Sequence, residues 1–217
     1  LEAGHPLPDE AGVAATAELL TTVSGLTARD NVIVLLTGGA SALLVAPAPG
    51  ITLAEKAETT DLLLRSGASI EEINCVRKRL SRVKGGQLLD HIGPAACLTL
   101  LLSDVPSGDH GSIGSGPTIR PSAGDEEPLA IIARYGLLDQ IPSAVRALLA
   151  TPQVAAPYSQ NGRSDVVVLG DSGSAVAAVR TAAQDAGIGF HVVNQNMTGN
   201  THLQARLMAE ALRNCRA

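Results

Sequence analysis

A turn containing glycine and serine follows an apolar strand near the start of the chain. The strand is predicted over residues 31–36, and the turn reads Thr37-Gly-Gly-Ala-Ser-Ala-Leu-Leu44. Where such a strand ends, Gly38, Gly39 and Ser41 leave backbone N–H groups and a hydroxyl, which is how α/β proteins hold anions. A tight turn whose glycines only permit close packing is the structural alternative. A nucleophile elbow is excluded, because Leu43 stands where that motif needs a glycine.

Cationic side chains are concentrated in one short segment of an otherwise acidic chain. Five of the 16 lysines and arginines fall within eight residues, namely Arg77, Lys78, Arg79, Arg82 and Lys84. Cations near a helix C-terminus complement the helix dipole, but five without an intervening acid exceed that need. Lys84 is followed by two glycines, so its ammonium adjoins adaptable backbone. The segment therefore predicts an anion site.

A long turn-rich loop over residues 103–124 follows a second buried strand at 97–102. Asp104 lies just beyond that strand and is the candidate for holding Mg²⁺ or orienting a hydroxyl, because hard cations need oxygen ligands. A turn-capping aspartate is the alternative. A third loop, Gly170-Asp-Ser-Gly-Ser174, joins a strand to a helix and lacks the dinucleotide glycines. We expect Ser172 to cap that helix.

Strands and helices alternate along the chain and predict a doubly wound, mostly parallel, Rossmann-like α/β sheet with helices on both faces, a three-layer αβα arrangement. Two capping boxes, at residues 52–55 and 69–72, mark helix starts, and Asp9 is a further N-cap. Ligands of such sheets bind beyond the carboxyl ends of the strands. The expected helices cover 10–22, 52–66, 69–82, 127–135, 142–150, 172–186 and 202–214, and the strands 31–36, 97–102, 165–169 and 190–193.

Composition excludes several classes of protein. The chain has 217 residues, a net charge of −5, two Tyr, one Phe and no Trp, which argues against a nucleic-acid-binding module. No apolar run approaches the ~18 residues of a membrane helix. Three widely spaced cysteines show no metal-binding spacing, so we expect a reducing, cytoplasmic setting. A homodimer is compatible with the sequence. Because the chain starts with Leu1 and not Met, we expect a segment of a longer polypeptide.

The order of several motifs resembles that in the class II glycerate kinases, the MOFRL-associated glycerate 2-kinases often labelled hydroxypyruvate reductase. The resemblance covers residues 4 to about 150 closely, and continues more loosely to about 210. It implies that residues 1–217 form the large domain of such a kinase, without the family's amino-terminal segment and carboxyl-terminal MOFRL domain. This chain alone is then expected to be weakly active or inactive. The motifs are 4–12, 37–44, 66–81, 84–86, 102–106 and 115–118.

The resemblance implies ATP-dependent phosphorylation of D-glycerate to 2-phosphoglycerate, with Mg²⁺, in a cleft between two domains. Carried over by position, Lys78, Arg77 and Asp104 would be catalytic, Asp104 also serving the metal. The residues expected to bind substrate or phosphate are Gly38, Gly39, Ser41, Lys84, Ser115, Gly116, Thr118 and His5. Phosphoryl transfer needs mainly positioning and charge neutralisation, which such residues supply.

The chain also departs from the family pattern. Ala40 replaces the third glycine of the first loop, Arg120 to Ala123 stand where an acidic residue is usual, and residues 198–202 differ from the family's Gly-Glu-Ala-Arg. A non-catalytic anion-binding fragment or degenerate paralogue therefore remains an alternative. An NAD(P)H-dependent hydroxypyruvate reductase is a weaker alternative, because it rests on a label alone.

Overall fold

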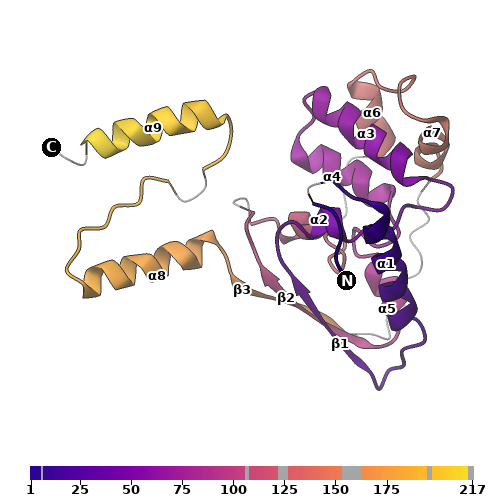
Figure 1. The fold of residues 1–217 in the computed structure, drawn as a ribbon, viewed down its shortest axis with the longest axis horizontal. Coiled ribbons are helices and arrows are strands. Elements are labelled where there is room, and N and C mark those ends of the chain that lie inside the picture. Colours follow the sequence, from indigo (N-terminus) through magenta and orange to yellow (C-terminus); the bar gives the residue numbers. More distant parts are fainter. Residues whose placement is uncertain (6, 106–107, 122–126, 153–162, 195–196, 215–217) are drawn as a thin grey trace.

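The computed structural model describes residues 1–5, 7–105, 108–121, 127–152, 163–194 and 197–214. Its sheet contains β1 (Asn31–Leu36), β2 (Ala96–Leu102) and β3 (Ser164–Gly170) in the order β1-β2-β3, and both pairings are parallel. The register places Val34 beside Thr99 and Thr99 beside Val166. The predicted parallel α/β fold is confirmed, and the carboxyl ends of all three strands lie at one edge (Figure 1).

Helices α1 (Glu10–Val23) and α5 (Leu88–Ile92) cover one face of the sheet. Their side chains Leu20, Leu88 and Ile92 form a cluster with Cys97 of β2. Side chains alternate between the two faces of a strand, so Ile33, Leu35 and Val167 lie on the opposite face. All three side chains are exposed. The sequence predicted helices on both faces of the sheet, and within the described residues they cover one face.

A helical layer beside the sheet contains most of the remaining core. Helices α3 (Leu53–Arg65), α4 (Ile70–Arg79), α6 (Pro128–Arg134) and α7 (Ser143–Ala150) pack around fully buried aliphatic side chains (Figure 1). Burial of each such side chain contributes roughly 1.5–3 kcal/mol, which fixes the positions of α3 and α4. The central members are Leu63, Ile73, Leu80, Ile131 and Val145.

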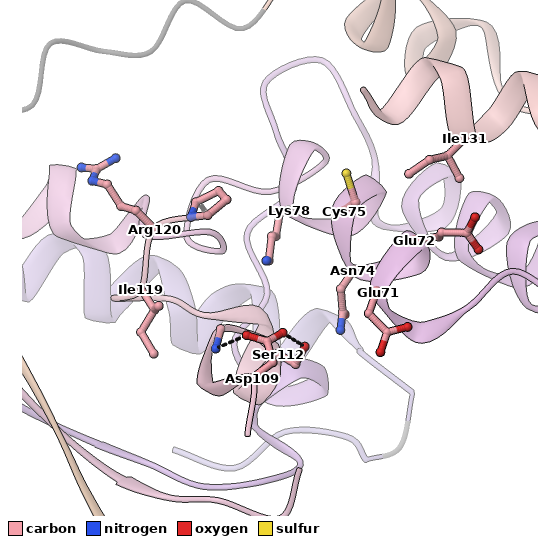
Figure 2. Close-up of a pocket in the computed structure, with 12 residues that line it drawn as sticks. Glu71, Glu72, Asn74, Cys75, Lys78, Asp109, Ser112, Ile119, Arg120 and Ile131 are labelled. Carbon is pink, nitrogen blue, oxygen red and sulfur yellow. Dashed lines mark hydrogen bonds between the residues drawn. The ribbon is translucent and has the colours of Figure 1, made fainter. Parts of the chain in front are cut away.

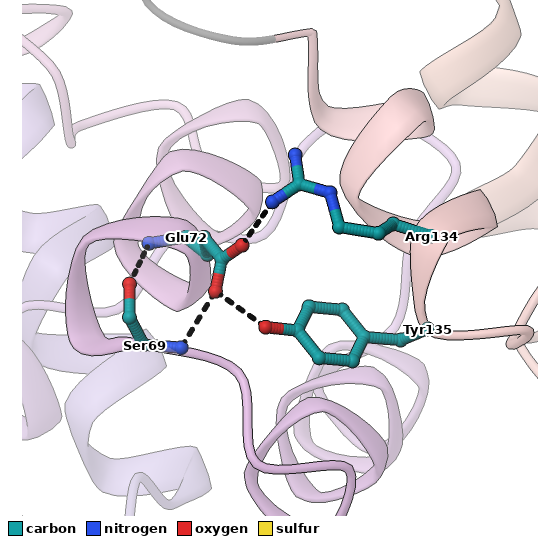
Figure 3. A network of polar contacts seen from close by, with 4 residues as sticks. All are labelled: Ser69, Glu72, Arg134 and Tyr135. Carbon is teal, nitrogen blue, oxygen red and sulfur yellow. Dashed lines mark hydrogen bonds and ion pairs between the residues drawn. The ribbon is translucent and has the colours of Figure 1, made fainter.

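Glu72 links α4 to α6 and completes the capping box that predicted the start of α4. Its carboxylate accepts from the backbone N–H of Ser69 at 2.7 Å and the Tyr135 hydroxyl at 2.7 Å, and pairs with Arg134 at 2.6 Å (Figure 3). The Ser69 backbone hydrogen bond is the main reason that the pKa of Glu72 lies below its usual value. The predicted starts of α3 and α4 are both confirmed.

Three details of the predicted elements were wrong. Residues 190–193 form no strand, because this short apolar run makes no ladder with the sheet. Helix α4 ends at Arg79, since Ser81 forms an antiparallel bridge with Pro47. Helix α8 (Ser172–Asp185) is capped by Asp171, not Ser172, because the Asp171 carboxylate accepts from the Ser174 N–H at 2.7 Å.

The sequence did not indicate three short helices: α2 (Ala40–Leu43), α5 and the 3₁₀ helix η1 (His110–Ser115). Helices α8 and α9 (Thr201–Asn214) contain no buried residue and lie apart from the rest (Figure 1). Among the described residues, no helix is both long enough and apolar enough to cross a membrane.

Candidate functional site

Ser41 is the centre of a polar cluster formed by segments far apart in the sequence. Gly39, in a left-handed conformation with φ of 82°, begins α2 and turns the chain away from β1. The Lys84 ammonium donates to both the carbonyl and the hydroxyl oxygen of Ser41 at 3.0 Å, and to the Gly114 carbonyl at 3.2 Å. Arg77 donates to the same hydroxyl at 2.6 Å. The structure thus brings together three predicted residues, Ser41, Arg77 and Lys84.

The proton positions in this cluster follow from the donors available. The Ser115 hydroxyl donates to the Asn74 side-chain oxygen at 3.1 Å, because that oxygen can only accept. The Ser41 and Ser115 hydroxyls lie 3.0 Å apart, so Ser41 donates its proton to Ser115. Ser41 consequently accepts from two cations and has no proton left for a ligand. In this arrangement the Ser41 hydroxyl holds Arg77 and Lys84, and its contact with substrate or phosphate stays a prediction.

The cluster carries uncompensated positive charge. Lys84 and Lys56 are buried at 0% and 5% exposure, and neither they nor Arg77 form an ion pair within the described residues. Burial, and then the charges of Lys56 and Arg77, hold the pKa of Lys84 well below its usual value. Burial and the charge of Arg77 lower the pKa of Lys56 to about 8. A buried cationic site of this kind favours an anionic ligand.

Asp104 lies beyond the carboxyl end of β2 and packs directly against the glycine turn. A Cβ atom built on Gly38 would overlap the Asp104 carboxylate, so only glycine allows this close approach. The side chain is exposed and makes no hydrogen bond or ion pair with the described residues. It lines a cavity of about 500 Å³ together with Thr37, Asp171 and Ser174. The segments 37–38, 102–104 and 170–175, which follow the three strands, therefore line one cavity beyond the carboxyl ends of the sheet, where ligands were expected to bind.

Lys78 points away from the cluster around Ser41, to which its neighbour Arg77 belongs. It lines a cavity of about 390 Å³ with Asn74, Asp109 and Arg120 (Figure 2). The Asp109 carboxylate accepts from the Gly111 N–H at 3.0 Å and from the Ser112 hydroxyl at 2.5 Å, so it stabilises the start of η1. Neighbouring positions on a helix point about 100° apart, which separates Lys78 from Arg77. A catalytic role for Lys78 stays a prediction.

The segment Ser115 to Thr118 is buried and holds the loop against Gly85 and Gly86. The Gly85 and Gly86 N–H groups donate to the carbonyls of Ser115 at 2.9 Å and Gly116 at 2.7 Å. The Thr118 hydroxyl lies 2.7 Å from the Thr99 hydroxyl beneath the sheet. Gly116 and Thr118 therefore support the site, and their contact with substrate or phosphate stays a prediction.

His5 lies beside the glycine turn. A Cβ on Gly39 would meet its Nε2 atom at 3.3 Å, so the imidazole sits over the start of α2. His5 is exposed at this turn, and its contact with a ligand stays a prediction. The structure thus keeps His5, Gly38, Gly39 and Asp104 at one end of the sheet.

Comparison with known proteins shows the family of this chain. Residues 1–150 match the family model described as a domain of unknown function, DUF4147. The chain belongs to this family. Several relatives carry the kinase name that the motifs predicted. A D-glycerate 2-kinase of Thermotoga maritima is 34% identical over 212 residues, covering 98% of this chain and 49% of its own length.

A second relative, from Agrobacterium vitis, is provisionally named hydroxypyruvate reductase and is 38% identical over 209 residues, covering 96% of this chain and 47% of its own. The crystal structure of glycerate kinase from Thermotoga maritima has a TM-score of 0.75 at 36% identity and covers 86% of this chain and 44% of that one. The resemblance to the class II glycerate kinases is confirmed. This DUF4147 chain spans about half the length of the relatives it matches.

The sequence reasoning missed two members of the cluster in this DUF4147 chain, Lys56 and Asn74. Lys56 shares the buried face of α3 with Thr59 and Leu63, at the i, i+3 and i+7 spacing of a core-facing stripe. The sequence feature that could have identified Lys56 is a lysine on the core-facing side of a predicted helix. Asn74 gave no comparable signal, because its role depends on Ser115, which is 41 residues away.

Proposed function

We propose that this chain provides the acceptor-binding part of an ATP-dependent D-glycerate 2-kinase. The observation that carries the proposal is a group of unpaired cations, with Lys56 and Lys84 buried and Arg77 half-buried, together with a glycine turn and a free carboxylate. The kinase names of its relatives support the same reaction. D-glycerate is a small carboxylate with a hydroxyl to be phosphorylated, so it needs a cationic clamp and a group that orients the hydroxyl.

In the proposed reaction the 2-hydroxyl oxygen of D-glycerate attacks the γ-phosphorus of ATP. A new oxygen–phosphorus bond forms, the bond to the β,γ-bridging oxygen breaks, and ADP leaves with the electron pair. The cations of the cluster fix the substrate's anionic group, and Asp104 orients the hydroxyl or accepts its proton. Gly38 is required because it lets the Asp104 carboxylate approach the turn.

The donor set near Asp104 fits a magnesium ion held largely by nucleotide phosphates. Mg²⁺ usually keeps several waters and takes only one or two protein carboxylates. Asp104 is exposed and has no other partner among the described residues, whereas the nearby Asp171 carboxylate is occupied in capping α8. No group of three or more metal-ligating side chains occurs in the described ranges, so Asp104 is the proposed contact. A bound Mg²⁺ would neutralise charge on the transferring phosphoryl group.

We further propose that residues 1–217 correspond to the large domain of the kinase and that the reaction site lies between this domain and another. The strand-end cavity is consistent with this, because it opens beside Asp104 and is lined from this chain by only a few polar groups. We place the reaction in the cytoplasm, and a homodimer remains compatible with the fold.

The test is a product analysis with purified protein, ATP, Mg²⁺ and D-glycerate. Both the 217-residue chain and any longer polypeptide encoded by its gene should be assayed. Phosphorus-31 NMR distinguishes 2-phosphoglycerate from 3-phosphoglycerate and from free phosphate. Formation of 2-phosphoglycerate by the longer polypeptide supports the proposal, and release of phosphate without a phosphoglycerate product contradicts it.

The names of some relatives favour a second candidate, reduction of hydroxypyruvate with a nicotinamide cofactor. The strand-end turns 37–44 and 170–174 lack the glycine pattern that binds dinucleotides, which weighs against it. Titration of NADH followed by its fluorescence decides the matter, since an oxidoreductase must bind the cofactor saturably.

A further inference from the structure

Lys56 is a buried cation without a partner. Its side chain projects from α3 into the interior and is 5% exposed, and its Nζ atom has no hydrogen-bond partner in the described part of the chain. An unpaired buried charge costs far more free energy than a surface one, because water no longer solvates it. A lysine in this position therefore needs either neutralisation or an anion.

The charged groups acting on Lys56 increase that need. Helix α3 packs against α4 through the core shared by Leu63 and Val76, so Arg77 of α4 repels Lys56. Both cations in turn act on Lys84, which follows α4. Arg77 uses one N–H, toward Ser41, and none of its other donors has a partner among the described residues. Lys84 already donates to three acceptors, so it contributes charge and not a free donor.

We propose that Lys56 and Arg77 directly hold one oxyanion, with Lys84 contributing its charge. The ligand group is a carboxylate or a phosphate, since the guanidinium and ammonium donors of this pair suit both. The assignment of this group to the substrate or to the nucleotide rests on the proposed function, whereas the site itself does not. Because the Lys56 ammonium is sealed from solvent, ligand entry requires a local rearrangement of its surroundings.

The test compares thermal unfolding of the 217-residue chain with Lys56→Met and Arg82→Met. Arg82 is an exposed cation of the same basic segment, so its variant controls for net charge. Inorganic phosphate, D-glycerate and ATP are titrated separately at pH 7 and constant ionic strength. We expect saturable stabilisation of the wild type and Arg82→Met, and affinity about ten- to a hundredfold weaker in Lys56→Met.

The three ligands separate the sources of the anion. Stabilisation by D-glycerate but not phosphate assigns the site to the substrate carboxylate, and the converse assigns it to a phosphate. Equal responses of the wild type and Lys56→Met to every ligand, or no saturable response at all, overturn the proposal. Phosphate binding would survive a failure of the kinase assay, so the two proposals can fail separately.

A second measurement uses the wild type, so it does not depend on whether Lys56→Met folds. Lysine side-chain NMR of the wild type, with Lys56 assigned by Lys56→Arg, reports the titration of its ammonium directly. Saturating anion should raise the titration midpoint of Lys56 above its value in the ligand-free protein. An unchanged Lys56 midpoint in the presence of a bound anion overturns the assignment.

Discussion

Arg77 donates a 2.6 Å hydrogen bond to the hydroxyl of Ser41, 36 residues earlier in the chain. This contact links the basic end of α4 to the glycine turn that follows β1. It also aims a second cation at an oxygen already bonded to Lys84. Two cations sharing one neutral hydroxyl leave positive charge unbalanced, which is the electrostatic basis of the proposed anion site.

Replacing Lys56 should change the pH dependence of stability. The pKa of Lys56 is about 8 in the folded chain and near 10.4 when unfolded, so between these values the unfolded state binds more protons. Stability conferred at this residue therefore rises with pH across that window, by about 3 kcal/mol. Urea unfolding from pH 7 to 10.5 should show a larger rise in the wild type than in Lys56→Met, in which the lowered pKa of buried Lys84 still contributes a rise of its own.

The comparison must be made as a difference between the two proteins. Burial raises the pKa of the Cys97 thiol, and the hydrogen bond to Glu72 raises the pKa of Tyr135. The contribution of each of these groups to the free energy of unfolding therefore falls as pH rises through its pKa in the unfolded chain. This is the opposite direction from Lys56. A difference curve that stays flat from pH 7 to 10.5 would show that Lys56 is not held in a perturbed state.

Gly38→Ala should displace Asp104. The added methyl group would occupy the position of the carboxylate, so the turn or the aspartate must move. We expect a loss of stability below about 1 kcal/mol, because the exposed carboxylate can rotate away, but at least tenfold lower kinase activity, because Asp104 leaves its position. Gly189→Ala is the matched control, since its Cβ would meet no atom within 4 Å. Equal behaviour of the two variants would argue against close packing at Gly38.

Two variants of Ser115 separate the cost of backbone strain from the contribution of its hydrogen bonds to stability. It is the one non-glycine with positive φ, 60°, in the described residues, and its hydroxyl joins Ser41 to Asn74. Ser115→Ala should cost about 1–3 kcal/mol, because two buried groups lose a partner while the strained backbone remains. Ser115→Gly should cost about 1 kcal/mol less, since glycine adopts positive φ readily. Chemical denaturation measures both, and a less stable Ser115→Gly would contradict this division.

Asp104→Asn should impair turnover more than binding. Removal of the charge leaves the size of the side chain unchanged, so we expect kcat to fall about a hundredfold or more with little change in affinity for D-glycerate. Steady-state kinetics of the active polypeptide over a range of Mg²⁺ concentrations provide the measurement. Asp139→Asn, at a carboxylate that is 94% exposed, is the control. Similar kcat values for the two variants would remove Asp104 from the reaction.

The sequence predicted those parts of the fold that local interactions specify. The capping boxes at Thr52 and Ser69 located two helices, and the continuous apolar run of β2 indicated a buried parallel strand. Residues 190–193 failed because an apolar run alone does not create a strand partner. The site could be predicted less completely from the sequence. Burial of Lys56 and the orientation of the Ser41 hydroxyl depend on contacts between α2, α3, α4 and η1, which are far apart along the chain.

The most direct test of the central claim is calorimetric titration of D-glycerate into the 217-residue chain and into its Arg77→Met and Arg82→Met variants. The account predicts saturable binding by the wild type and Arg82→Met, and affinity reduced at least tenfold in Arg77→Met. Equal affinities of all three proteins, or no binding of D-glycerate by the wild type, would contradict the claim that the cluster around Ser41 binds the substrate.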